Sequence, residues 1–318
     1  MDTSSSTRAA GDRTWLVALA ASLWGTSSLM RDPLKAEYPA ATIVFFEHLV
    51  LVLCLAPWLV GAVRALLAAS PRVKAAVLVI GAGSSALATT LFTAAFAYGD
   101  PVTPQVLQKL QPLFAMLLAA VLLGERLARR FAWFAVPALA GAWLLAFADP
   151  FAVSISSAVA AVLALGAALL WGAGTVLGRL AGSELSPVHL TTLRFAVGLP
   201  ATALIAAAQG VPLALSPVTG RNVVLLLVLA LVPGLLALTL YYRGLSRTPA
   251  SRATLAELAF PVTAAAVGVG VLDAHLTWSQ WLGFVLVLAA ITALSLHERS
   301  AERPAVRVPE PVGTSASV

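Results

Sequence analysis

Ten long apolar runs, separated by short charged or turn-forming segments, dominate this chain. A helix needs about 20 mainly apolar residues to cross the hydrocarbon layer of a bilayer. Only 11% of the 318 residues are charged and 60% are hydrophobic, so a soluble fold could not cover its apolar surface. The sequence therefore predicts an all-α integral membrane protein with ten transmembrane helices. We expect these helices near residues 14–30, 39–63, 75–98, 102–123, 131–148, 155–178, 187–208, 222–242, 252–272 and 277–296.

The lysines and arginines are distributed unequally among the connecting segments. With the amino terminus in the cytoplasm, fifteen of them fall in cytoplasmic segments and three in external ones, namely Arg31, Lys35 and Arg221. Short cytoplasmic loops of membrane proteins carry such an excess of positive charge. Both termini are therefore predicted to be cytoplasmic, in a multi-pass protein of the bacterial plasma membrane. The polar ends, 1–13 and 297–318, are predicted to be disordered tails.

The second half of the chain resembles the first. The first span contains LWGTSS and the sixth contains LWGAGT, so that Trp24 and Trp171 are 147 positions apart. In the fourth and ninth spans, Pro112 and Pro261 are 149 positions apart. A repeat at a nearly constant offset indicates duplication of one structural unit.

The repeat divides the chain into two units of five helices, 14–148 and 155–296. Because five is an odd number, the two units must enter the membrane in opposite directions. Inverted repeats of this kind are typical of secondary transporters, whose binding sites lie near the midplane between the repeats.

Three features together resemble the EamA branch of the drug/metabolite transporter superfamily: the Trp-Gly pair of the first span, the stretch PLFAMLLAAVLLGERL at Pro112–Leu127, and the repeated five-span unit. The resemblance implies ten helices, cytoplasmic termini and a central cavity between the halves. It also implies transport, often outward, of amino acids, their derivatives, other metabolites or drugs. The sequence departs from the family pattern at Glu47, where an arginine is usual; the second half has Arg194 there.

Four ionised side chains, Glu47, Lys109, Arg194 and Glu257, lie well inside the predicted spans. A charge near the bilayer centre costs roughly 2.5–3.5 kcal/mol, so each needs a reason to be there. Glu47 and Lys109 both lie about 10–12 Å from the outer face, and we expect them to be neighbours. Arg194 and Glu257 form a similar pair counted from the inner face. These residues are candidates for substrate binding or gating; the alternatives are structural ion pairs or side chains that extend to the interface.

The prolines of the fourth and ninth spans are predicted to break their helices. Proline has no amide hydrogen, so Pro112 is expected to free the carbonyl of Gln108, and Pro261 that of Glu257. A free carbonyl beside polar side chains is a means of building a polar site in lipid. Ordinary helix kinks are the alternative. The polar face beside Pro112 carries Gln105, Gln108 and Lys109, and the face beside Pro261 carries Thr254 and Glu257.

Three aromatic residues, Trp24, Trp171 and Tyr241, are candidates for the wall of a cavity that accepts apolar or aromatic solutes. Aromatic residues near span ends also serve as anchors at the membrane interface, which is the competing interpretation.

The sequence lacks the motifs of several other functions. It has no Walker A, HExxH or GxSxG motif, its four histidines lack metal-ligand spacing, and its basic residues form no continuous stripe. We therefore expect no metal, no cofactor and no nucleic-acid partner.

These observations predict a secondary transporter that works by alternating access, and the resemblance to the EamA branch implies export of a small organic metabolite. Either Glu257 or Glu47 is a candidate for proton coupling. A membrane-embedded enzyme or receptor that uses the same midplane cavity is the alternative. The sequence gives no indication of oligomeric state.

Overall fold

The computed structural model describes residues 13–123, 131–152, 154–245, 256–257 and 259–302. These residues fold into helices joined by short turns, and the part of the chain described contains no strand. The elements in the first half are α1 (Thr14–Gly25), α2 (Ser28–Lys35), α3 (Ala40–Ala68), α4 (Pro71–Val79), η1 (Ile80–Leu87), α5 (Ala88–Ala95), α6 (Thr103–Leu107), η2 (Gln108–Leu110), α7 (Gln111–Leu123) and α8 (Phe131–Ala146). Those in the second half are α9 (Ile155–Ala181), α10 (Pro187–Ala208), α11 (Gly220–Leu229), η3 (Ala230–Leu236), α12 (Ala237–Leu245), α14 (Ala259–Val271) and α15 (Trp278–Glu302).

Serine caps fix where several of these helices begin. Ser186 precedes Pro187, and its side chain accepts a hydrogen bond from the His189 amide at the start of α10. Ser70 caps α4 in the same way, followed by Pro71. A serine cap followed by proline is a strong start signal, because proline at the first helical position loses no hydrogen bond.

The helices follow the predicted apolar runs closely, with three differences. The first run is divided into α1 and α2, and the fourth into α6, the 3₁₀ turn η2 and α7. The predicted carboxy-terminal tail 297–318 begins too early, because α15 continues to Glu302. The amino-terminal tail up to residue 12, Thr254 in the ninth run and the residues beyond 302 lie outside the described residues.

By length and composition, five described helices could cross a membrane, and three further apolar helices are shorter. The five are Ala40–Ala68, Pro71–Ala95, Ile155–Gly178, Pro187–Ala208 and Gly220–Tyr241; the shorter ones are Trp133–Ala146, Ala259–Val271 and Trp278–Ala293.

Two of the long helices contain a π-helical segment in the middle. These segments, η1 and η3, begin at Ile80 and Ala230, which are 150 positions apart. In η1 the wider turn accompanies close packing: a Cβ on Gly81 would lie 2.5 Å from the side chain of Val197 on α10. Such π-helical turns are frequent at functional sites.

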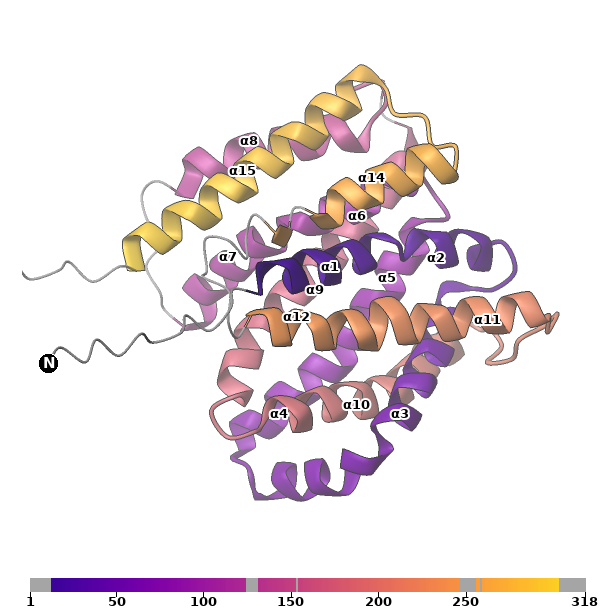
Figure 1. Ribbon diagram of the computed structural model, residues 1–318, viewed down its shortest axis with the longest axis vertical. Coiled ribbons are helices and arrows are strands. Elements are labelled where there is room, and N and C mark those ends of the chain that lie inside the picture. Colours follow the sequence, from indigo (N-terminus) through magenta and orange to yellow (C-terminus); the bar gives the residue numbers. More distant parts are fainter. Residues whose placement is uncertain (1–12, 124–130, 153, 246–255, 258, 303–318) are drawn as a thin grey trace, which may run out of the picture.

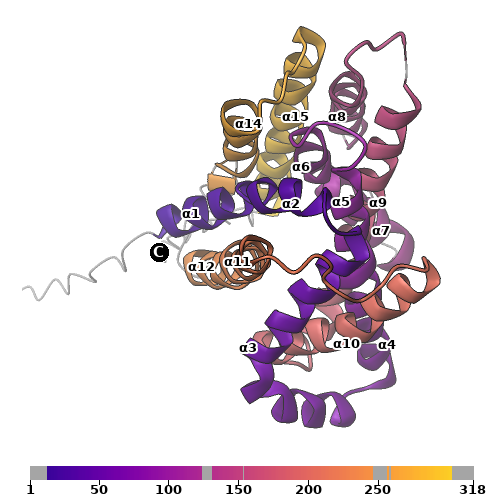
Figure 2. The same cartoon turned by 90° about the vertical axis from the view of Figure 1, so that its right-hand side faces the viewer.

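The helices form three groups when viewed from two directions (Figures 1 and 2). Helices α8 and α15 pack along each other at one end of the molecule, and α3, α4 and α10 lie at the other. Between them, α1 packs against both α12 and α14, while α9 packs against α5 and α7. The candidate site lies in this central region.

Candidate functional site

One group of predicted site residues comes together where α1, α12 and the start of α14 meet. The ring of Trp24 on α1 lies 5.1 Å from the ring of Tyr241 on α12. The Tyr241 hydroxyl donates a hydrogen bond of 2.6 Å to the Glu257 carboxylate. Close contact between helices holds this arrangement, because a Cβ on Gly25 would lie only 2.6 Å from the Phe260 carbonyl oxygen.

Lys109 reaches the same region from η2. Its ammonium nitrogen lies 4.5 Å from the centre of the Phe260 ring. The negative charge of Glu257 attracts this ammonium group. We call Trp24, Lys109, Tyr241, Glu257 and Phe260 the lysine cluster. Four of its five members were predicted from the sequence, but they come from four separate segments of the chain.

The break at η2 does not leave the Gln108 carbonyl free, as the sequence predicted. The Gln111 amide donates to this carbonyl across the 3₁₀ turn. An i to i+3 hydrogen bond thus replaces the one that Pro112 removes, and the expectation of a free carbonyl was wrong. Gln108 is partly buried in the turn, and Pro261 is buried in α14.

A second group of polar side chains surrounds Arg31 on α2. One guanidinium nitrogen of Arg31 lies 2.8 Å from Oε2 and 3.1 Å from Oε1 of Glu47, and another donates to the Thr93 hydroxyl. The Arg31 side chain also lies over the Phe92 ring, whose centre is 5.3 Å from the ring of Trp171. We call Arg31, Glu47, Phe92 and Thr93 the arginine cluster.

The predicted pairing of Glu47 with Lys109 is wrong. Glu47 is 8% exposed and its ion pair is with Arg31, itself 5% exposed. The sequence assigned Arg31 to an external loop because it follows the first apolar run. Arg31 lies seven residues after Trp24, on the same face if the helix continues. This spacing was the signal that could have placed Arg31 in the protein interior.

Arg194 lies in a different part of the molecule from Glu257. It is on α10, where its guanidinium donates a hydrogen bond of 3.3 Å to the Ser84 carbonyl of η1. Helices α10 and α14 lie on opposite sides of the α1 and α12 layer (Figures 1 and 2). The structure therefore separates the predicted inner pair.

Gln105 connects α6 to the turn between α1 and α2, where Ser27 lies. Its amide group is fully buried; Nε2 donates to the Pro101 carbonyl at 3.0 Å, and Oε1 accepts from the Ser27 hydroxyl at 3.4 Å. Among the residues described, no group of three His, Cys, Asp or Glu side chains could hold a metal ion.

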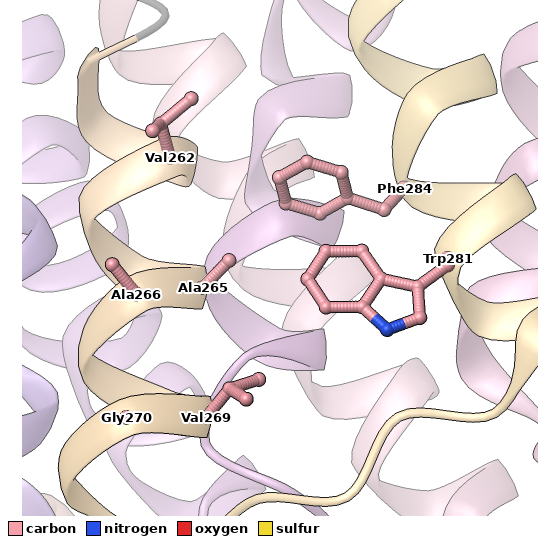
Figure 3. Close-up of a pocket in the computed structure, with 7 residues that line it drawn as sticks. All are labelled: Val262, Ala265, Ala266, Val269, Gly270, Trp281 and Phe284. Carbon is pink, nitrogen blue, oxygen red and sulfur yellow. The ribbon is translucent and has the colours of Figure 1, made fainter.

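An apolar groove of about 450 Å³ lies apart from both clusters, between α14 and α15 (Figure 3). The walls include Trp281 and Phe284 from α15 and Val262 from α14, which face each other across the groove. Among the described residues that line it, no side chain is charged, so this groove does not explain the buried charges.

Comparisons with a family model and with named relatives give consistent results. The model of the EamA-like transporter family matches the chain twice, at residues 14–147 and 158–296. The chain is 30% identical to the riboflavin transporter ImpX of Fusobacterium nucleatum over 78% of its length and 85% of that protein. It is also 30% identical to the uncharacterized transporter YwfM of Bacillus subtilis, over 52% of the chain and 55% of that protein.

A solved structure shares the fold, with a TM-score of 0.57 and 23% identity over 92% of this chain and 99% of that one. The family match and the named relatives point to a transporter rather than an enzyme. The chain belongs to the EamA-like transporter family.

Proposed function

We propose that this protein is a secondary transporter that exports a small organic metabolite by alternating access, with the lysine cluster as its central site. The observation that carries the proposal is the arrangement of Lys109 and Glu257. Each charge is held by an uncharged neighbour, the ammonium by the Phe260 ring and the carboxylate by the Tyr241 hydroxyl. Such contacts are weaker than a buried ion pair and can be exchanged for contacts with a solute.

The chemistry of the lysine cluster favours a planar aromatic solute with polar groups at its edge. Trp24, Tyr241 and Phe260 offer ring faces for stacking. Lys109 offers donors and Glu257 offers acceptors at the same place. Riboflavin has both properties, and a relative of this chain is named as its transporter. Riboflavin is therefore the first solute to test.

The proposed architecture has ten transmembrane helices in two inverted repeats of five. It is supported by the two separate matches to the family model. The π-helical segments η1 and η3, which start 150 positions apart, agree with the offset of the sequence repeat. Interrupted helices such as α6–η2–α7 are common at the binding sites of transporters.

The proposed location is the plasma membrane, with both termini in the cytoplasm. The unequal distribution of lysine and arginine supports this orientation. A reporter that is active only in the cytoplasm, fused to the carboxy terminus, should be active. Activity of a reporter that works only outside would reverse the orientation.

Proton coupling through Glu257 is part of the proposal. Glu47 is already neutralised by Arg31, whereas Glu257 has the Tyr241 hydroxyl as a partner and Lys109 nearby. A carboxylate in this position can exchange protons as the solute enters and leaves.

Flux of radiolabelled riboflavin in proteoliposomes tests the proposal. Wild-type protein should carry riboflavin in a direction that depends on how the protein is inserted in the proteoliposome membrane. If transport is coupled to protons, the flux should also depend on a pH gradient. Glu257→Gln should reduce this flux, and Glu37→Gln, which changes an exposed carboxylate, serves as the matched control. Binding of riboflavin without flux would instead favour the receptor alternative.

A further inference from the structure

Two buried hydrogen-bond donors on α2 have no acceptor among the residues that the structure describes. They are the hydroxyl of Ser28 and Nε of Arg31. Ser28 is fully buried, and Arg31 is 5% exposed. A buried donor without a partner costs about 1–3 kcal/mol, so native proteins rarely contain two close together.

The two donors share one face of the helix. Ser28 and Arg31 are three residues apart on α2, and such residues are neighbours on a helix surface. Arg31 keeps its position through the terminal nitrogens of its guanidinium, which bind Glu47 and Thr93. Its Nε–H is therefore held in place without taking part in the ion pair.

The same helical face leads to the lysine cluster. Trp24, which stacks on Tyr241, is four residues before Ser28 and seven before Arg31. The turn between α1 and α2 keeps right-handed helical backbone angles at Thr26 and Ser27, so the face is continuous. At 1.5 Å per residue, Ser28 lies roughly 6 Å and Arg31 roughly 10 Å along the axis from Trp24. These spacings match the length of an aromatic metabolite.

We infer that Ser28 and Arg31 form a subsite that binds an acceptor oxygen of the transported solute, either a carbonyl or a carboxylate oxygen. This inference rests on the proposed transport function, because the ring of the same solute would stack at Trp24. Glu47 already balances the charge of Arg31, so the subsite selects by hydrogen bonding and does not require an anion.

The subsite can be tested by transport of matched solutes. Riboflavin carries ring carbonyls, tryptophan carries a carboxylate, and tryptamine is tryptophan without the carboxylate. In proteoliposomes, Ser28→Ala should raise the KM for whichever of riboflavin and tryptophan the wild type carries, by about fivefold, the loss of one hydrogen bond. The KM for tryptamine should not change. An equal effect on tryptamine, or no effect on any transported solute, would overturn the subsite.

A second measurement needs no transported solute. Ser28→Ala removes an unsatisfied donor, so the thermal unfolding midpoint of the solute-free protein in detergent should stay the same or rise. Ser85→Ala is the matched control, because the Ser85 hydroxyl is equally buried but lies 2.9 Å from Nε2 of His48. Its midpoint should fall. A clear fall for Ser28→Ala would show that its hydroxyl has a permanent partner, and would overturn the subsite. Absence of flux for all three solutes would reject the proposed substrate class. The unfolding midpoint of Ser28→Ala would then be the test of the subsite.

Discussion

The arginine cluster and the lysine cluster both hold a positive and a negative charge inside the molecule, but they hold them differently. In the arginine cluster, Arg31 and Glu47 contact each other directly, at 2.8 Å. In the lysine cluster, Lys109 lies over the Phe260 ring and Glu257 accepts a hydrogen bond from the Tyr241 hydroxyl. The first arrangement neutralises both charges within the protein and leaves Nε of Arg31 for a further acceptor. The second leaves part of the bonding capacity of both charged groups for a ligand.

This difference assigns different tasks to the two clusters. A buried ion pair is expensive to break, because separation leaves two desolvated charges. The arginine cluster connects α2 to α3 and α5 and therefore fixes the position of α2. The lysine cluster connects α1, α12, η2 and the start of α14 through weaker contacts, which suits a site that changes partners during transport.

The largest effect is expected from breaking the arginine cluster on one side only. Glu47→Gln or Arg31→Met alone leaves one buried charge without its partner and should destabilise the protein by about 3–5 kcal/mol. The double variant removes both charges and should be milder than either single change. Unfolding midpoints and the yield of folded protein in detergent measure this. If the double variant is as unstable as the worse single one, the ion pair is not the source of the effect.

The next effect tests whether the lysine cluster is a transport site. Glu257→Gln keeps the size of the side chain and an acceptor for Tyr241 but deletes the charge. We expect normal membrane insertion, a near-normal unfolding midpoint and a fall in kcat/KM for riboflavin of at least about tenfold, or a loss of its pH dependence. Wild-type flux and an unchanged pH profile in Glu257→Gln would show that Glu257 is not part of the transport site. Both clusters would then be structural.

A smaller effect is expected from Tyr241→Phe. This change keeps the ring that stacks on Trp24 and deletes the hydroxyl that donates to Glu257. A hydrogen bond to a charged group contributes about 1.5–3 kcal/mol, and water entering the site can replace part of it. Flux should therefore fall less than in Glu257→Gln. A larger loss of flux than in Glu257→Gln would mean that Tyr241 contacts the solute directly.

The sequence named more residues of the lysine cluster than of the arginine cluster, for a physical reason, although it paired Lys109 with Glu47 and Glu257 with Arg194. Apolar runs set the helix positions, and Lys109, Glu257, Trp24 and Tyr241 stand out because polar or large aromatic side chains inside such runs need an explanation. Arg31 follows its apolar run and therefore resembles a loop residue. Its burial depends on α2 continuing the helix and on Thr93 and Glu47 arriving from two other helices, which local patterns do not encode. The Gln108 carbonyl was also beyond sequence reasoning, because a 3₁₀ turn and a free carbonyl follow equally from one proline.

An exposed carboxylate provides the reference for these buried ones, and the smallest expected effect. Glu184, in the turn before α10, accepts hydrogen bonds of 2.7 Å from both the hydroxyl and the amide of Ser70, the cap of α4. The Ser70 hydroxyl, then its amide, and the nearby charge of Lys74 hold the pKa of Glu184 below its ordinary value of 4.5. A carboxylate with a lowered pKa in the folded state stabilises the protein fully above its ordinary pKa, and this contribution is lost as the pH falls through the lowered one.

Glu184→Gln should therefore lower the unfolding midpoint slightly at pH 7, and its difference from wild type should shrink below about pH 4. Because Glu184 is fully exposed, solvent screens its charge, and the shift should be well below that of either single change in the arginine cluster. Glu37→Gln, which changes another exposed carboxylate, is the control and should leave the midpoint unchanged at both pH values. A Glu184→Gln shift as large as that of Glu47→Gln would mean that contact geometry, and not burial, sets the strength of these interactions. The contrast between the two buried clusters would then have to be explained by hydrogen bonding alone.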